Sequence, residues 1–180
     1  MKIAWMIVAA ALAVPAMAQL KLDALNGLAA KAKESTEITL DAATLQMANG
    51  FLGDGKDKNP AVAKMLGKLK SLSVRSYEFS KAGQYDPGLV RALQSQLAAQ
   101  GWTRFLNFND QEDGESFELY SKTVDGKSAG FAMVAAEAKE LTVIYIDGEL
   151  SLSDLSGLSG QFGIPKIPIP NGQNDKKGKE

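Results

Sequence analysis

The sequence predicts a single α+β domain, with a largely antiparallel sheet and helices packed on one face. Four strand-like runs follow one another in the C-terminal half, and two Asp-Gly pairs connect them, at Asp113-Gly114 and Asp125-Gly126. Asp-Gly is a strong signal for a tight hairpin, and successive hairpins make neighbouring strands antiparallel. The chain of 180 residues is 45% hydrophobic and 23% charged, which suits one self-sufficient core.

The N-terminus predicts a secretory signal peptide over residues 1–18. Lys2 supplies the positive charge, residues 3–14 are an apolar run, and Ala16-Met17-Ala18 is a small-x-small cleavage site. The apolar run is shorter than the about 20 residues that span a bilayer. No Cys follows the cleavage site to carry a lipid. We therefore expect cleavage after Ala18 and a periplasmic or secreted bacterial protein without a stable membrane anchor.

The next part of the chain is mainly helical by its periodicity. Leucines at helical spacing predict an N-terminal helical segment within residues 19–35, and residues 37–40 alternate as a short strand. Asp41 is placed to cap a second helix. After a loop at 53–58, Asn59-Pro60 gives the cap and first position of a third helix.

A strand over 72–79 and the clearest helix of the chain come next. Asp86-Pro87 opens this helix, an apolar stripe includes Leu93 and Leu97, and Gly101 stands where a helix ends. We expect Trp102, directly after Gly101, to be buried. The strand, helix and following strand predict a crossover, which would make one strand pair parallel.

The C-terminal half predicts a four-strand meander. Its strands are expected at 102–108, 115–123, 128–136 and 141–149. A weak helix follows at 151–160 and closes a single domain over residues 36–163. The tail, 164–180, holds three of the six prolines, four Lys and two acidic residues, and we expect it to be extended or disordered.

Several short motifs together resemble one exported bacterial family. They are residues 74–79, Gly101-Trp102, residues 113–115, residues 137–144 and residues 160–165. In order and spacing they are similar to the family called domain of unknown function 4252, over about residues 36–165. The resemblance implies an exported α+β domain with no assigned activity. Members are often encoded near sigma and anti-sigma factors, which implies envelope signalling as the setting.

The composition excludes several kinds of chemistry. The chain has no Cys and no His, which excludes disulfides, thiolate nucleophiles, Ser-His-Asp triads and the usual zinc sites. A net charge of −1 gives no footprint for nucleic acid. The acidic run around Asp113 is a poor calcium loop, because Tyr120 stands where its last ligand would be. We therefore expect no metal and no cofactor.

One strand face predicts a binding surface. Alternation places Arg75 and Tyr77 on one face of their strand, and Glu118, Tyr120 and Lys122 on one face of theirs. An open, aromatic-bearing face of this kind suits a peptide, a polysaccharide or a partner protein. The hypothesis requires these side chains to be exposed and adjacent. Should helices cover that face, the loops around Tyr85 and Asp113 are the next expected site.

Three functions remain open at this point. The first is an exported, non-enzymatic envelope protein that binds an envelope protein or peptide, in envelope signalling or stress response. The second is a hydrolase that uses carboxylates alone, with Glu78, Glu118 and Glu149 as candidates on strands. The third is a lipid-binding or structural periplasmic module. Two facing carboxylates in a deep pocket would favour the second, a continuous apolar cavity the third, and a flat sheet without a pocket the first.

Overall fold

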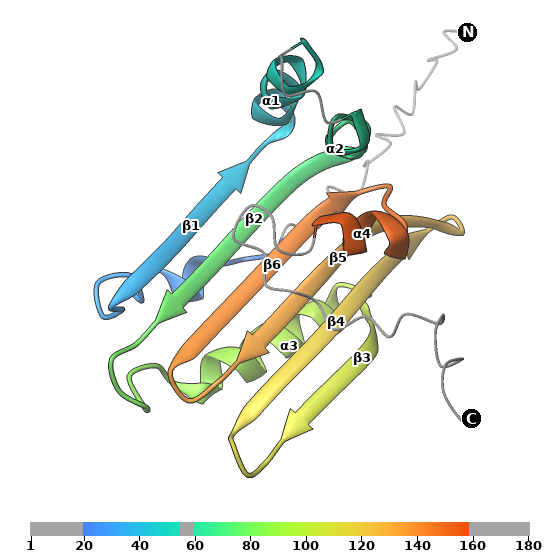
Figure 1. Ribbon diagram of the computed structural model, residues 1–180. Helices are drawn as coiled ribbons and strands as arrows, with labels where there is room; N and C mark the ends of the chain where they lie inside the picture. Colours follow the sequence, from blue (N-terminus) through green and yellow to red (C-terminus); the bar gives the residue numbers. More distant parts are fainter. Residues whose placement is uncertain (1–19, 55–59, 159–180) are drawn as a thin grey trace, which may run out of the picture.

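The computed structural model describes residues 20–54 and 60–158, which form one open sheet covered by helices on both faces (Figure 1). Six strands lie in the order β1-β2-β6-β5-β4-β3. Every neighbouring pair is antiparallel. This arrangement confirms the α+β class and the antiparallel sheet. The signal peptide and the tail expected from the sequence lie outside the described residues.

The elements follow the expected order closely. The strands are β1 (Glu34–Leu40), β2 (Leu69–Glu78), β3 (Thr103–Asp110), β4 (Glu115–Val124), β5 (Lys127–Ala136) and β6 (Glu140–Gly148). The helices are the 3-10 helix η1 (Asp23–Leu25) and the α-helices α1 (Ala42–Asp54), α2 (Pro60–Leu66), α3 (Pro87–Ala99) and α4 (Leu152–Leu158).

Strands β3 to β6 form the predicted meander. Between β4 and β5, Asp125 (φ 51°) and Gly126 (φ 76°) both adopt the left-handed conformation of a two-residue hairpin turn. Between β3 and β4, Gly114 has φ 70°, and the Asp110 carboxylate accepts the Glu112 N–H at 2.9 Å. The two Asp-Gly pairs therefore mark the two turns, as expected.

Among the described residues no strand pair is parallel, contrary to the expectation. Helix α3 does connect β2 to β3, but these strands stand second and last in the sheet. The meander runs back from β3 towards β2 and inserts β6 as the antiparallel neighbour of β2. The prediction was wrong because a crossover fixes the direction of its two strands but leaves open what lies between them.

Helix α3 covers one face of the sheet. The Asp86 carboxylate caps it by accepting the Gly88 N–H at 2.8 Å, and the chain leaves through Gly101 with φ 78°. Its buried residues Val90, Leu93 and Leu97 share a core with strand residues from β2, β4, β5 and β6. Trp102 belongs to this core and is 6% exposed, so its expected burial is confirmed.

The opposite face carries the other three α-helices, which differs from the expectation of helices on one face only. Leu45 of α1, Met65 of α2 and Leu155 of α4 share a second core with Ile144 and Ile146 of β6. Strand β6 is apolar on both sides, so both of its faces need cover. Figure 1 shows α1 and α2 at one end of this face, and α4 over the upper part of the sheet.

The N-terminal segment differs from the helix expected within residues 19–35. It contains only the 3-10 helix η1, and Gly27 turns the chain with φ 91°. Leu20, Leu25 and Leu28 are nevertheless buried in the core under α3. The segment is thus an integral part of the domain. None of the helices within residues 20–54 and 60–158 is both long and apolar enough to span a membrane.

Candidate functional site

The strand face predicted as a binding surface is covered by α3. Tyr77 is fully buried, and Glu118 and Tyr120 are each 4% exposed. Both tyrosines belong to the core that also contains Leu93 and Leu97 of α3. The open surface expected there is therefore absent. Alternation showed correctly which side chains share a face, but the pattern alone did not show which face the helix covers.

The five residues also form two separate groups. Arg75 pairs with Val143 of β6, which pairs with Val134 of β5, and Val134 in turn pairs with Glu118. Three strand spacings, about 14 Å, separate the β2 group from the β4 group. One ligand side chain would not reach both groups.

Partners within the fold occupy the remaining polar atoms of these groups. The Arg75 guanidinium donates to the Ile38 carbonyl at 2.8 Å and to the Thr39 hydroxyl at 2.9 Å. The Tyr77 hydroxyl donates to the Glu37 carboxylate at 2.6 Å. The Lys122 ammonium lies 5.7 Å from the centre of the Trp102 ring, within cation–π range.

Glu118 is the centre of a buried polar cluster. It accepts hydrogen bonds from the Arg104 guanidinium, from the Gln94 amide at 3.0 Å and from the Tyr120 hydroxyl. Hydrogen bonding to Glu118, with its charge, raises the pKa of Arg104. Burial first, and then Glu118, raises the pKa of Tyr120. These hydrogen bonds connect α3 to β3 and β4, so Glu118 has a structural role in the fold.

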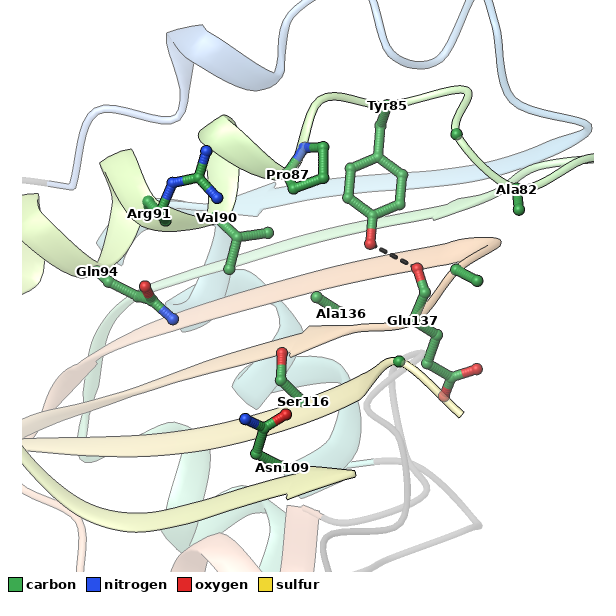
Figure 2. Close-up of a pocket in the computed structure, with 13 residues that line it drawn as sticks. Ala82, Tyr85, Pro87, Val90, Arg91, Gln94, Asn109, Ser116, Ala136 and Glu137 are labelled. Atoms are coloured by element: carbon green, nitrogen blue, oxygen red, sulfur yellow. Dashed lines mark hydrogen bonds between the residues drawn. The ribbon is translucent and has the colours of Figure 1, made fainter. Parts of the chain in front are cut away.

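A pocket of about 390 Å³ opens beside the start of α3, at the sheet end where β3 and β5 finish (Figure 2). We call it the strand-end pocket. Asn109, Ser116 and Ala136 form one row across β3, β4 and β5, because Asn109 pairs with Ser116 and Ser116 pairs with Ala136. Val90 and Gln94 of α3 face this row, and the loop before α3 closes the pocket with Tyr85.

Tyr85 is held in place from two sides. Its ring stacks on Phe79 with the ring centres 5.4 Å apart, and its hydroxyl donates to the backbone carbonyl of Glu137. Burial, and then the charge of Glu137, raises the pKa of Tyr85. The tyrosine thus ties the loop before α3 to the turn between β5 and β6, and this contact fixes the pocket wall.

Glu137 is the single carboxyl residue among the described residues that line the strand-end pocket. Burial, followed by the charges of Glu140 and Glu115, raises its pKa. A glycosidase of the usual kind needs two carboxyl groups across a cleft. The described lining of the pocket offers one carboxyl group and lacks the second that this reaction needs.

The pocket combines an apolar floor with a polar rim. Val90, Pro87 and Ala136 supply apolar surface, whereas Arg91 and Asn109 are exposed polar residues at its edge. The alternative expectation, the loops around Tyr85 and Asp113, coincides with this position. Sequence reasoning missed Arg91, Gln94 and Glu137, because their convergence depends on the long-range pairing of strands. The one signal in the sequence that could have located the pocket is the predicted order of elements. The turn between β3 and β4, the turn between β5 and β6 and the start of α3 all lie at one end of the sheet.

The acidic run around Asp113 forms a turn, with the Asp110 carboxylate accepting backbone N–H groups from Glu112 and Asp113. Across residues 20–54 and 60–158, no three acidic side chains gather as metal ligands.

A family model with the description domain of unknown function (DUF4252) matches residues 30–158. This range includes all six strands, from β1 to β6, over their full length, together with α4. No curated protein and no solved structure matches the chain.

Proposed function

The chain belongs to the DUF4252 family, and we propose that it acts by binding an extended segment of a partner protein in the bacterial envelope, with the strand-end pocket as the contact site. The family resemblance adds envelope signalling or stress response as the setting. The match covers the whole sheet and so includes every strand that lines the pocket.

The lining of the pocket is the observation that carries this proposal. An apolar centre surrounded by a polar rim is the usual arrangement of a protein interface. Val90 and Pro87 can receive an apolar side chain, while Arg91, Asn109 and Ser116 can hydrogen-bond the peptide backbone on either side. The volume of about 390 Å³ suits one or two side chains of an extended peptide.

Export is the second part of the proposal. We propose that the signal peptide is removed after Ala18, which makes Gln19 the first residue of the mature protein. Leu20, the second residue of this mature chain, is 5% exposed, so the mature chain would retain this buried leucine. Mass analysis of the protein from the periplasm should find Gln19 at the N-terminus, and Met1 in a membrane fraction would contradict it.

The two alternative functions have less support. A carboxylate hydrolase would need Glu118, which Arg104 and Tyr120 occupy, or a partner for Glu137 in the pocket. A lipid-binding module would need a continuous apolar cavity. The apolar space between α4 and the sheet, near Leu155, holds only about 10 Å³, which is far below the volume of a lipid chain.

Site-specific cross-linking in the native cell tests the proposal. A photo-reactive amino acid at Arg91 or Asn109 should form an adduct with one envelope protein. The same amino acid at Gln46, which is exposed on α1 on the opposite face, is the matched control and should not form it.

Binding to the purified partner then quantifies the contact. Arg91→Ala and Asn109→Ala should each weaken the Kd about five-fold or more, equivalent to about 1 kcal/mol, and Gln46→Ala should leave it unchanged. Equal adducts from all three positions would contradict the proposed site. Release of a product from a glycan or peptide substrate, lost in Glu137→Gln, would favour the hydrolase instead.

A further inference from the structure

Strand β3 lies at one edge of the sheet (Figure 1). It pairs with β4 on its inner side, and within residues 20–54 and 60–158 no strand pairs with its outer side. Six of its eight residues are exposed, and it contains neither Pro nor Lys. The N–H and C=O groups of such an edge can pair with another strand, and Pro or Lys at an edge usually prevents this.

The opposite edge strand, β1, is protected against pairing with itself. Its central residue is Glu37, so two β1 strands that paired about their centres would bring two carboxylates together. In addition, the Arg75 guanidinium extends from β2 and donates to the Ile38 carbonyl of β1 at 2.8 Å. Strand β3 instead has the uncharged Asn107 near its centre. Of the two edges, β3 is therefore the one suited to self-pairing.

Strand β3 also carries exposed aromatic side chains. Phe108 is 52% exposed and Phe105 is 43% exposed, although both are large and apolar. Phe108 pairs with Phe117 of β4, and Phe117 and Leu106 both pack against the core on the α4 side. Phe108 therefore lies on this face of the sheet, beside the open edge. Exposed apolar side chains next to unpaired backbone groups are typical of a protein contact.

We propose that β3 pairs with β3 of a second copy of this chain, antiparallel and about a two-fold axis at Asn107. A bulge sets this position. Phe105 is its extra residue, because the residues before and after it, Arg104 and Leu106, pair with neighbouring residues of β4. Asn107 is then the central one of the seven β3 residues that have a partner in β4. An axis there lets each of the seven meet a residue of the second copy in a self-complementary contact.

The apolar side chains match in this register. Leu106 lies one position before Asn107 and Phe108 lies one position after it, so Leu106 of each copy is opposite Phe108 of the other. Both side chains lie on the α4 face, and directly opposed residues of an antiparallel pair share a face. The contact occurs twice by symmetry and removes both Phe108 rings from water, which is favourable.

The polar side chains match as well. Arg104 is opposite Asn109 of the second copy, whose side-chain carbonyl can accept from the guanidinium. Arg104 already donates to Glu118, but its side chain is 47% exposed and retains further N–H donors. Thr103 is opposite Asp110, so a hydroxyl meets a carboxylate. No like charges oppose each other, and the positive end of each strand lies beside the negative end of the other. This complementarity favours a second copy over an unrelated strand.

The interface shares only Asn109 with the described lining of the strand-end pocket. Arg91 and Glu137 belong to α3 and to the turn after β5, and neither is on β3. Arg91→Ala therefore reports on peptide binding alone, and the dimer is tested separately from it.

Disulfide formation at single introduced cysteines tests the register. Directly opposed residues of an antiparallel pair have Cα atoms about 4.5–5.5 Å apart, within the range that a disulfide bridges. The chain has no Cys, so Asn107→Cys at this exposed position introduces a single thiol. With oxidised glutathione, the purified mature variant should form a covalent dimer at least about ten-fold faster than Asn109→Cys. Asn109 is the matched control, because about 13 Å along the strand separates it from Asn109 of the second copy.

Sedimentation of the unsubstituted mature chain measures the association itself. The fraction of dimer should rise with concentration. Phe108→Lys places an ammonium group opposite Leu106 of the second copy and should weaken the dimer Kd about ten-fold or more. Met47→Lys is the matched control, because Met47 is a 62% exposed apolar side chain on α1, and this change should leave the Kd unaltered. The cysteine variants retain both apolar residues, so they test the register even if Phe108→Lys lowers stability.

Three results would overturn the proposal. A mature chain that sediments as a monomer up to about 1 mM would show that β3 does not pair with itself. Equal rates of disulfide formation in Asn107→Cys and Asn109→Cys would show that the copies do not meet in this register. A dimer with the same Kd in folded Phe108→Lys would place the interface elsewhere on the molecule.

Discussion

At the scale of single residues, Glu118 was a candidate catalytic carboxylate, but its hydrogen bonds within the fold give it a structural role. Its two oxygens accept from Arg104, Gln94 and Tyr120 in a site that is 4% exposed. Glu118→Gln keeps the size but replaces one acceptor oxygen with an NH₂ group, so one of these donors would lose its partner. We expect a loss of about 1–3 kcal/mol in the free energy of unfolding, measured by urea denaturation.

Glu149→Gln is the matched control for this change. Glu149 is exposed, and the same substitution there should alter stability by less than about 0.5 kcal/mol. Equal unfolding midpoints for Glu118→Gln and the unsubstituted protein would mean that the buried cluster contributes no stability.

A second prediction at the scale of single residues concerns Asp154 and the dependence of stability on pH. Hydrogen bonds from Lys68, and then from Ser151, lower the pKa of Asp154 from its ordinary value of 3.8 to about 2. The folded state therefore binds this proton more weakly than the unfolded state. The stabilisation is present above about pH 4 and is lost as the pH falls towards 2.

The measurement compares Asp154→Asn with the unsubstituted protein across that range. The Asp154 carboxylate, in the first turn of α4, accepts the Ser151 N–H at 2.8 Å and pairs with Lys68 at 2.8 Å near the surface. We therefore expect a difference of about 1 kcal/mol at pH 6. The difference should shrink as the pH approaches 2. A difference that stays constant with pH would assign the stabilisation to the cap geometry alone.

At the scale of elements, local signals in the sequence predicted where helices and strands begin and end, but not which strands pair with one another. Asp125-Gly126 and Asp86-Pro87 predicted a hairpin and a helix start, because turns and caps depend on a few neighbouring residues. The segment around η1 was wrongly expected to be an α-helix. Its leucine spacing fits a helix, but tertiary burial of Leu25 and Leu28 accounts for the same leucines.

Helix α3 gives the element-scale prediction. Leu93 is 1% exposed and Leu97 is fully buried against the sheet. Leu93→Ala and Leu97→Ala should each lower the free energy of unfolding by about 2–5 kcal/mol, since each leaves a cavity under the helix. Ser95→Ala, an exposed position on the same helix, should change it by less than about 0.5 kcal/mol. Losses below about 1 kcal/mol at both leucines would contradict tight packing of α3.

At the scale of the whole molecule, the decisive contacts are distant in the sequence. Strand β6 lies between β2 and β5, and this placement brings the end of β5 beside the start of α3. No local sequence pattern shows that these two segments are adjacent. The sequence alone therefore could not predict that Arg91, Gln94 and Glu137 line one pocket. The Arg75 and Glu118 groups could not be separated for the same reason, because the number of strands between β2 and β4 was unknown.

The N-terminal segment packs between α3 and the sheet, and its contribution to stability can be tested by truncation. Leu20, Leu25 and Leu28 are each at most 6% exposed, in the core between α3 and the sheet. A chain that starts at Lys33 lacks all three, and each buried Leu contributes about 1.5–3 kcal/mol. The total is comparable with the stability of a whole domain, about 5–15 kcal/mol. We therefore expect this chain to be largely unfolded, whereas a chain that starts at Gln19 should unfold cooperatively in urea. Equal unfolding midpoints would show that the sheet and α3 form a sufficient core without the segment, and the domain would then begin at β1.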